Sequence, residues 1–182
     1  AKLAQASYLV GCQATGDAVV VDPNRDVQPY LDAAAKEGLR ITHVTETHIH
    51  ADFVSGAREL ARRAGAQLLL SDEGDASWKY AFAAGDGARL LKDGDAFMVG
   101  NIRLEVLHTP GHTEGSVCLL ATEENLLFSG DTLFANGWGR VDLPGGSAEQ
   151  MVDSLVRLSR YHDGLAVLPG HGRSTTIGRE RA

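Results

Sequence analysis

Short runs of apolar residues, bounded by turn residues, recur along most of the chain and predict strands. The runs are rich in Val, Ile and Leu, and Gly, Asn or Asp stands near their ends, as is typical of strands in a packed sheet. Asp93-Gly94 and Gly100-Asn101 are turn signals between neighbouring runs. The strands predicted in this way are residues 7–10, 18–21, 41–45, 67–70, 89–91, 96–99, 102–107, 116–121, 125–129 and 165–168.

Three stretches show apolar residues at helical spacing instead. In the second of them Val54, Ala57 and Leu60 fall on one face, and Gly38 ends the first. The predicted helices are residues 27–37, 53–64 and 148–161. Because helices fall at intervals between strands, with no linker or repeat, the pattern predicts a single α/β domain over residues 1–182. We expect sheets inside and helices outside.

Composition narrows the class of protein and its partners. The chain has 182 residues, 43% of them hydrophobic and 23% charged, as in an ordinary globular domain. A net charge of −7 and the lack of any Lys/Arg run disfavour nucleic acid and anionic membranes as partners. No apolar stretch reaches the roughly 18–20 residues that a membrane span needs. Cys12 and Cys118 stand far apart and predict buried, reduced thiols, so the expected location is the cytoplasm or an organelle matrix.

A dense set of metal-ligating side chains follows the predicted strand 41–45. His48, His50 and Asp52 alternate along this segment, so their side chains can converge on one point. Two imidazoles and a carboxylate form a natural ligand set for zinc, iron or manganese. Alone, this spacing is only moderately specific.

The same kind of residue recurs after three later strands. His112 lies just beyond the strand 102–107, Asp131 beyond 125–129 and His171 beyond 165–168. Loops at one edge of a sheet are where α/β folds gather functional groups. Together with the loop of His48, four loops offer His or Asp side chains after a strand. Packing in a core does not explain this recurrence, so these residues predict a metal site. His43, His108 and His162 have no such pattern and are expected in structural or surface roles.

In this order, the motifs T-H-x-H-A-D, T-P-G-H-T, S-G-D-T-L-F and P-G-H-G resemble the metallo-β-lactamase superfamily. The resemblance covers nearly the whole chain. It implies an αββα sandwich with its metal at one edge of the sheets. The metal site that it implies is built from His48, His50, Asp52, His112, Asp131 and His171.

The two halves of the chain resemble different branches of that superfamily. Up to about Thr113 the chain is similar to persulfide dioxygenases, especially those fused to rhodanese domains, in the stretches 8–12, 21–26, 46–56 and 71–74. From Gly115 onward it is more similar to short glyoxalase II-type hydrolases, in the stretches 129–134, 139–146 and 169–178. Both branches imply a small thiol-type substrate, a persulfide or a thioester of glutathione. The first also suggests a functional link to a rhodanese domain.

One position departs from the two-metal pattern of the superfamily, H-x-H-x-D-H. Phe53 stands where that pattern has its last histidine. A second metal would keep only Asp52, His171 and a shared Asp131, and a bulky apolar ring should weaken that site strongly. We therefore expect a single transition metal, with Fe(II) as the first choice and Zn(II) as the alternative. The departure also disfavours a β-lactamase.

Two chemistries remain open, and Asp52, Asp131 and His171 are the expected catalytic residues. In the iron chemistry His50, Asp52 and His171 would lie around the ligands or on the substrate side. With iron(II), the resemblance implies His48, His112 and Asp131 as ligands of a persulfide dioxygenase, which is the leading hypothesis. With zinc, Asp52 would orient or deprotonate a metal-bound water that attacks a thioester. A third alternative is a non-catalytic module that keeps the fold. Arg140 and Asp142 either line the edge of the site or form a plain salt bridge.

Overall fold

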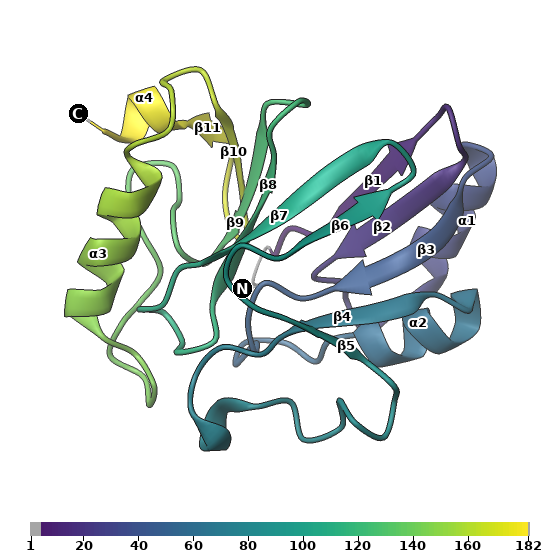
Figure 1. Cartoon of the computed structure of the whole chain (residues 1–182), viewed down its shortest axis with the longest axis horizontal. Coiled ribbons are helices and arrows are strands. Elements are labelled where there is room, and N and C mark those ends of the chain that lie inside the picture. The colour runs from purple at the N-terminus through teal and green to yellow at the C-terminus, as the bar shows by residue number, and fades with distance from the viewer. Residues whose placement is uncertain (1–4, 182) are drawn as a thin grey trace.

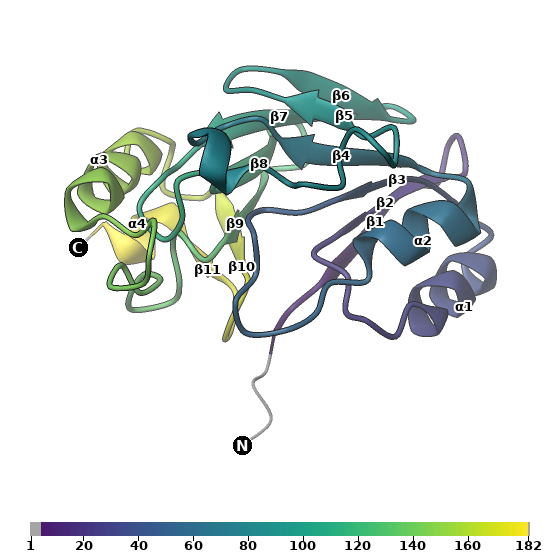
Figure 2. The same cartoon turned by 90° about the horizontal axis from the view of Figure 1, so that it is seen from below.

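The computed structural model describes residues 5–181 and shows four layers in the order helix, sheet, sheet, helix (Figures 1 and 2). The α/β fold class and the αββα sandwich predicted from the sequence are therefore confirmed. Within the described residues, the first sheet has the strand order β1 (Tyr8–Cys12), β2 (Asp17–Val21), β3 (Arg40–Thr45), β4 (Gln67–Ser71), β5 (Arg89–Leu91). The second sheet has the order β11 (Thr175–Thr176), β10 (Ala166–Pro169), β9 (Leu126–Gly130), β8 (Val117–Ala121), β7 (Ile102–His108), β6 (Ala96–Val99).

The connections between strands explain why the loops that carry the predicted site residues meet at one edge of the sandwich. Helices α1 (Gln28–Lys36) and α2 (Ala57–Ala64) are crossovers, so β2, β3 and β4 run parallel. In the second sheet, α3 (Ala148–Leu158) lies in the connection from β9 to β10, which also run parallel. β8 is antiparallel to both β7 and β9, so β7 points the same way as β9. The C-terminal ends of β7, β9 and β10 therefore share an edge.

Three apolar clusters hold the layers together. Between the sheets, Val21 and Leu69 of the first sheet pack with Leu104 and Phe128 of the second, and all four are buried. A second cluster joins the first sheet to α1 and α2, and a third joins the second sheet to α3 and to α4 (Ile177–Glu180). Because each sheet buries both faces, strands such as β2, β4 and β8 are nearly continuous apolar runs instead of alternating ones.

The sequence prediction was wrong about where α2 begins. The apolar pattern predicted a helix over residues 53–64, but α2 begins only at Ala57. The Gly56 amide donates to the carbonyl of Pro23 at 2.9 Å, and Ser55 forms an isolated bridge with Asn24. These backbone bonds to the loop after β2 compete with helix formation, so the chain stays extended through the residues that follow the His48 loop.

The two cysteines are free and buried, Cys12 in β1 and Cys118 in β8, as predicted. Burial raises the pKa of the Cys118 thiol to about 11. None of the helices described within residues 5–181 combines the length and the apolar character needed to cross a membrane.

Candidate metal centre

His48 lies in the loop after β3, and its neighbour Thr47 determines which of its ring nitrogens is free. The Thr47 hydroxyl donates to Asp22 Oδ2 at 2.7 Å, while the Thr47 amide donates to Asp22 Oδ1 at 2.7 Å. A hydroxyl has one proton, so the Thr47 oxygen, 2.9 Å from His48 Nδ1, accepts a hydrogen bond from that nitrogen. His48 Nε2 is therefore left with the lone pair that a metal needs.

His112 is oriented in the same sense by a backbone carbonyl. Its Nδ1 lies 2.8 Å from the carbonyl oxygen of Arg140, and because a carbonyl only accepts, Nδ1 carries the proton. His112 Nε2 lies 3.7 Å from Asp131 Oδ2. The rings of His48 and His112 meet edge to face, with 4.8 Å between their centroids. Both imidazoles thus present Nε2 as their free nitrogen.

Asp131 follows β9 and has a carboxylate oxygen with no partner. Its Oδ1 is buried and accepts no hydrogen bond from the residues described. Burial raises the pKa of Asp131, although His171 and His112 oppose that rise. A buried oxygen without a partner is costly, and a bound cation would remove that cost.

The three residues together fit a transition metal. One ligand atom from each of His48, His112 and Asp131 lies within 4.8 Å of the other two. Burial, and then the neighbouring histidines, hold the pKa of His48 well below its ordinary value, so this imidazole stays neutral. Two imidazoles and a carboxylate with an unpartnered oxygen form a donor set that suits iron(II) or zinc(II).

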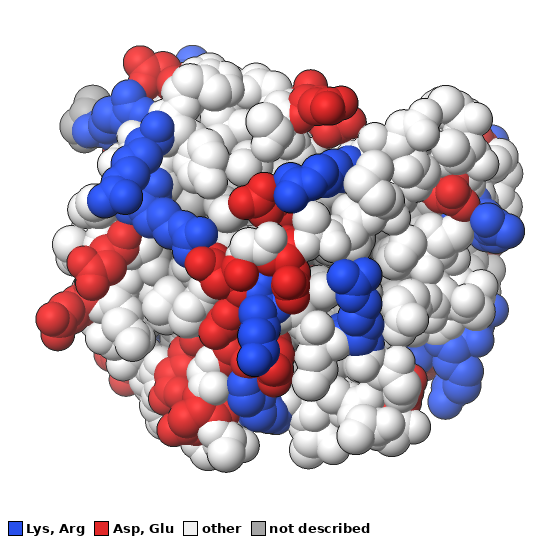
Figure 3. Space-filling model, viewed as in Figure 1, with Lys and Arg blue, Asp and Glu red and all other residues white. Residues whose placement is uncertain are grey.

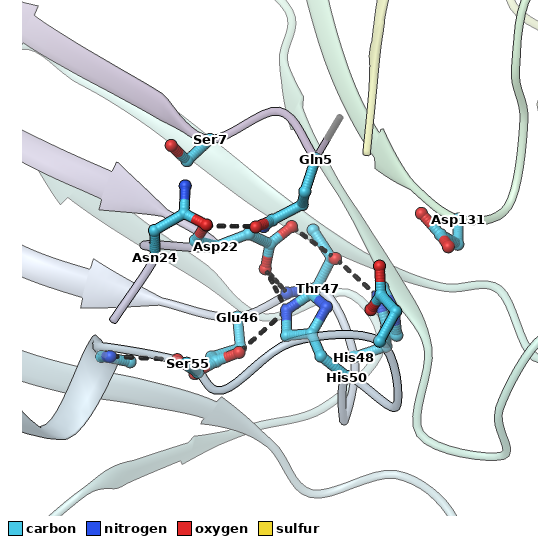
Figure 4. A network of polar contacts seen from close by, with 12 residues as sticks. Gln5, Ser7, Asp22, Asn24, Glu46, Thr47, His48, His50, Ser55 and Asp131 are labelled. Atoms are coloured by element: carbon cyan, nitrogen blue, oxygen red, sulfur yellow. Dashed lines mark hydrogen bonds and ion pairs between the residues drawn. The ribbon is translucent and has the colours of Figure 1, made fainter. Parts of the chain in front are cut away.

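His50 lies beside these three residues, but its Nε2 is already engaged. It is 2.9 Å from Glu46 Oε2 and 3.2 Å from Asp22 Oδ1, in the buried network of Figure 4. Burial alone would lower the pKa of His50, but the charges of Asp22 and Glu46 and the hydrogen bonds to them raise it to about 10. Asp22, Glu46 and His50 also place ligand atoms within 4.8 Å of one another. These atoms bond to each other, so we interpret them as support for the centre.

Asp52 and His171, predicted as part of the same site, adjoin it through Asp131. His171 Nε2 lies 3.3 Å from Asp52 Oδ2 and 3.5 Å from Asp131 Oδ2. Asp52 and His171 are partly exposed, whereas Asp131 is nearly buried. The structure therefore places all six sequence-predicted residues at one edge of the sandwich. Their roles as ligands or catalytic groups stay predictions.

Phe53, the position that departs from the two-metal pattern, packs against the same loop. The centroid of its ring lies 4.2 Å from that of His50. An apolar ring, which has no lone pair for a metal, thus stands next to the ligand loop. This position is why we keep the expectation of a single metal.

A cavity of about 510 Å³ opens over the centre. It is lined by Ala51, Asp52, His112, Asp131, Phe134, Gly139, Arg140, Leu143 and His171. At its edge Arg140 forms two 2.8 Å hydrogen bonds with Asp142, so Arg140 lines the site and also forms the salt bridge considered from the sequence. Elsewhere on the surface drawn in Figure 3, Lys and Arg side chains lie among Asp and Glu side chains, without a broad basic area. This face therefore lacks the basic area that binding of nucleic acid requires.

Sequence reasoning missed the roles of Asp22 and Glu46. Asp22 follows β2 and Glu46 follows β3, so both obey the rule that found the other residues, a polar side chain at the C-terminal end of a strand. A lone carboxylate after a strand is common, however, and nothing in the spacing shows that both meet His50.

The comparisons with known proteins agree with this geometry. The profile of the metallo-beta-lactamase superfamily matches residues 2–171. The chain belongs to that superfamily. It is 38% identical over 170 residues to a hydroxyacylglutathione hydrolase of Rhodospirillum rubrum, covering 90% of this chain but only 60% of that protein. The chain therefore spans less than two thirds of that relative's length.

Among solved structures, a metallo-beta-lactamase from Staphylococcus aureus superposes with a TM-score of 0.91 and 42% identity, covering 97% of this chain and 58% of that one. ETHE1 from Myxococcus xanthus has a TM-score of 0.86 and 35% identity, with 97% and 76% covered. TTHA1623, solved in a di-iron-bound form, has a TM-score of 0.83 and 30% identity, with 100% and 94% covered. The predicted family is thus confirmed, and transition-metal binding fits it.

Proposed function

We propose that this protein is a mononuclear iron(II) persulfide dioxygenase acting on glutathione persulfide. The overall reaction is glutathione persulfide + O₂ + H₂O → glutathione + sulfite + 2 H⁺. The terminal sulfur is oxidised, both atoms of O₂ are reduced into sulfite, and the sulfur–sulfur bond breaks to release the thiol. The first half of the sequence, which resembles persulfide dioxygenases, motivates this choice of reaction.

The observation that carries the proposal is the trio of His48, His112 and Asp131. Two imidazoles with free Nε2 atoms and one carboxylate would hold iron(II) on one side and leave other positions open. Iron(II) held in this way supplies the redox chemistry that lets a thiolate sulfur and O₂ react. Phe53, in contact with His50, disfavours a second metal in the same loop.

The residues around the trio would bind the persulfide and manage its protons. His171 and Asp52 lie 3.3 Å apart at the exposed side of the centre. His171 Nε2 would take the persulfide proton and return it to the departing thiolate. Phe134 and Leu143 give the cavity apolar walls, which limit the access of water to the sulfur. Both features are compatible with a substrate of thiol type.

Arg140 would recognise an anionic part of the substrate. It lines the cavity and forms a bidentate pair with Asp142, which shows that its guanidinium is oriented for a carboxylate. A glutathione carboxylate would replace Asp142 as its partner. Because both side chains of the exposed pair face solvent, little free energy opposes that exchange.

A second candidate is a zinc-dependent thioester hydrolase of the glyoxalase II type. Two observations favour it: the similarity to the Rhodospirillum rubrum hydroxyacylglutathione hydrolase, and the group formed by Asp52, Asp131 and His171 beside the trio. In this case Asp52 would orient a water for attack on the acyl carbon, and the thiolate would leave. The neighbour that binds two irons shows that this fold can hold a second metal.

The test compares both metals with both substrates. Metal-free protein is reloaded with iron(II) under argon or with zinc(II), and each form receives glutathione persulfide with O₂ or S-lactoylglutathione. We expect sulfite from the persulfide with the iron form alone, and little thioester hydrolysis by either form. Efficient thioester hydrolysis by the zinc form, with no sulfite from the iron form, would replace the proposal by the second candidate.

A further inference from the structure

We propose that Glu46 is a positioning residue of the metal centre: with Asp22 it fixes His50 Nε2 and so leaves Nδ1 as the nitrogen that faces the metal. The proposal rests on the metal centre described above, although not on the identity of the metal or on the reaction. It assigns a role to a residue that lies outside the predicted ligand set.

The contacts of His50 show that the Glu46 interaction is the shorter of two. Nε2 lies 2.9 Å from Glu46 Oε2 and 3.2 Å from Asp22 Oδ1. That same Asp22 oxygen also accepts the Thr47 amide at 2.7 Å, so it is shared between two donors. The side chains of His50 and Glu46 are 4% and 3% exposed, so water competes little for this bond. Glu46 is therefore the better placed acceptor for His50.

Glu46 is itself held from its other side. The Ser55 hydroxyl donates to Glu46 Oε1, and the Ser55 oxygen accepts the amide of Ala57, the first residue of α2, at 3.0 Å. The carboxylate thus lies between the end of β3 and the start of α2. This anchoring gives Glu46 one orientation, and that orientation determines the position of His50.

Two buried carboxylates around one imidazole are expensive for the fold and need a reason. Each ionised carboxylate loses hydration, and Asp22 and Glu46 repel each other. Burial raises the pKa of Glu46, and Asp22 adds to this rise against the opposing effect of His50. An apolar residue would fill the same space without that cost. The arrangement does, however, hold a proton on Nε2, so Nδ1 is the nitrogen whose proton a bound metal would replace.

The position of the ring supports this role. Figure 4 shows His50 between the two carboxylates and His48, and the centroids of the two imidazoles lie 4.1 Å apart. Because the carboxylates bind Nε2, the nitrogen left for the centre is Nδ1. Such outer carboxylates raise the basicity of a ligating histidine, and their loss typically lowers metal affinity by about 10–100-fold.

A double-mutant cycle on metal affinity tests the inference without any activity measurement. Cobalt(II) binding is measured by competition with a chromophoric chelator for the wild type, Glu46→Leu, His50→Ala and the double variant. We expect Glu46→Leu to lose about 10–100-fold in affinity and His50→Ala to lose at least as much. In the His50→Ala background, Glu46→Leu should cost no more than about twofold, because the two residues act as one unit.

Glu46→Gln is the conservative variant, and it covers the case in which Glu46→Leu does not fold. It keeps an oxygen acceptor of the same shape, so most of the affinity should return, with a shifted cobalt(II) absorption band. That shift should vanish in the His50→Ala background. Equal losses from Glu46→Leu in both backgrounds, or a band shift that does not need His50, would overturn the inference.

The outcome separates this inference from the proposed function. If His50→Ala binds cobalt(II) as tightly as the wild type, His50 does not face the metal and the inference fails, while the trio of His48, His112 and Asp131 stands. Thermal unfolding of the metal-free variants serves as the folding control.

Discussion

Single hydrogen bonds decide what each histidine of the centre can do. Thr47 accepts from His48 Nδ1, and the Arg140 carbonyl accepts from His112 Nδ1, so both rings present Nε2. In His50 the supporting contact is at Nε2 instead of Nδ1, and Glu46 provides it. Asp131 completes the trio with an oxygen that has no other partner among the described residues. The outer hydrogen bonds thus prepare the donor atoms before a metal arrives.

The first prediction separates ligands from neighbouring groups. His112→Ala and Asp131→Ala each remove one member of the trio, so the purified variants should contain little metal by elemental analysis. His171→Ala should retain metal and lose turnover, because His171 contacts the other carboxylates instead of completing the trio. His162→Ala, at an exposed position, is the control and should match the wild type. Comparable metal loss in the His171 variant would make His171 a ligand and support a second site.

A second prediction tests the departure from the two-metal pattern. Phe53→His adds an imidazole beside Asp52, His171 and Asp131, enough donors for zinc's usual coordination number of about four. Grown in zinc, the variant should bind about two metals and gain thioester hydrolysis, since two zinc ions stabilise an attacking hydroxide and a developing oxyanion. The same variant with Asp52→Ala should lose the added metal. If Phe53→His keeps one metal and its original activity, the ring of Phe53 is not what excludes the second metal. The conformation of the loop would then be the cause.

At the scale of the elements, the centre needs loops that approach each other closely. Gly170 directly follows β10 next to Asp131, and its amide donates to the Gly130 carbonyl at 2.7 Å. A Cβ at Gly170 would lie 2.3 Å from Asp131 Oδ1, and one at Gly130 would lie 2.4 Å from Thr47 Oγ1. The glycines before the ligands thus serve close packing between strand ends.

This packing predicts that Gly170→Ala damages the metal centre more than the fold. The added methyl group must displace the Asp131 carboxylate, so we expect the cobalt(II) affinity to fall by about tenfold or more, as in losses of supporting contacts elsewhere. Gly137→Ala is the matched control, because a Cβ there meets nothing within 4 Å. Competition titrations of both variants provide the comparison. Equal affinities would show that Asp131 can shift without consequence.

Predicting these elements from the sequence worked where a pattern was long and local. β8 is a continuous apolar run and β7 begins with alternating apolar and polar residues, and the position of each ligand just after a strand predicted one shared edge. The start of α2 could not be predicted, because the Gly56–Pro23 bond that prevents helix formation joins distant loops. β11 and α4 are too short to leave a periodic signal. The contact of Glu46 with His50 also depends on side-chain orientation, which spacing does not encode.

On the scale of the whole molecule, the metal centre lies where the two sheets meet. His48 comes from the first sheet, whereas His112 and Asp131 come from the second, so neither sheet holds the trio alone. The apolar cluster between the sheets, with Phe128 and Leu69 buried in it, keeps these halves in register. The proposed trio therefore comes together only where the two sheets pack against each other.

The most direct test of the proposed reaction is the ratio of O₂ consumed to sulfite formed. Iron-loaded protein receives glutathione persulfide in a sealed oxygen-electrode chamber, and sulfite is assayed in the same sample, with Asp131→Ala as the control for uncatalysed oxidation. The account predicts equimolar O₂ and sulfite, at a rate that the Asp131→Ala protein does not reach. No O₂ uptake above that of the Asp131→Ala control, or uptake without matching sulfite, would contradict it.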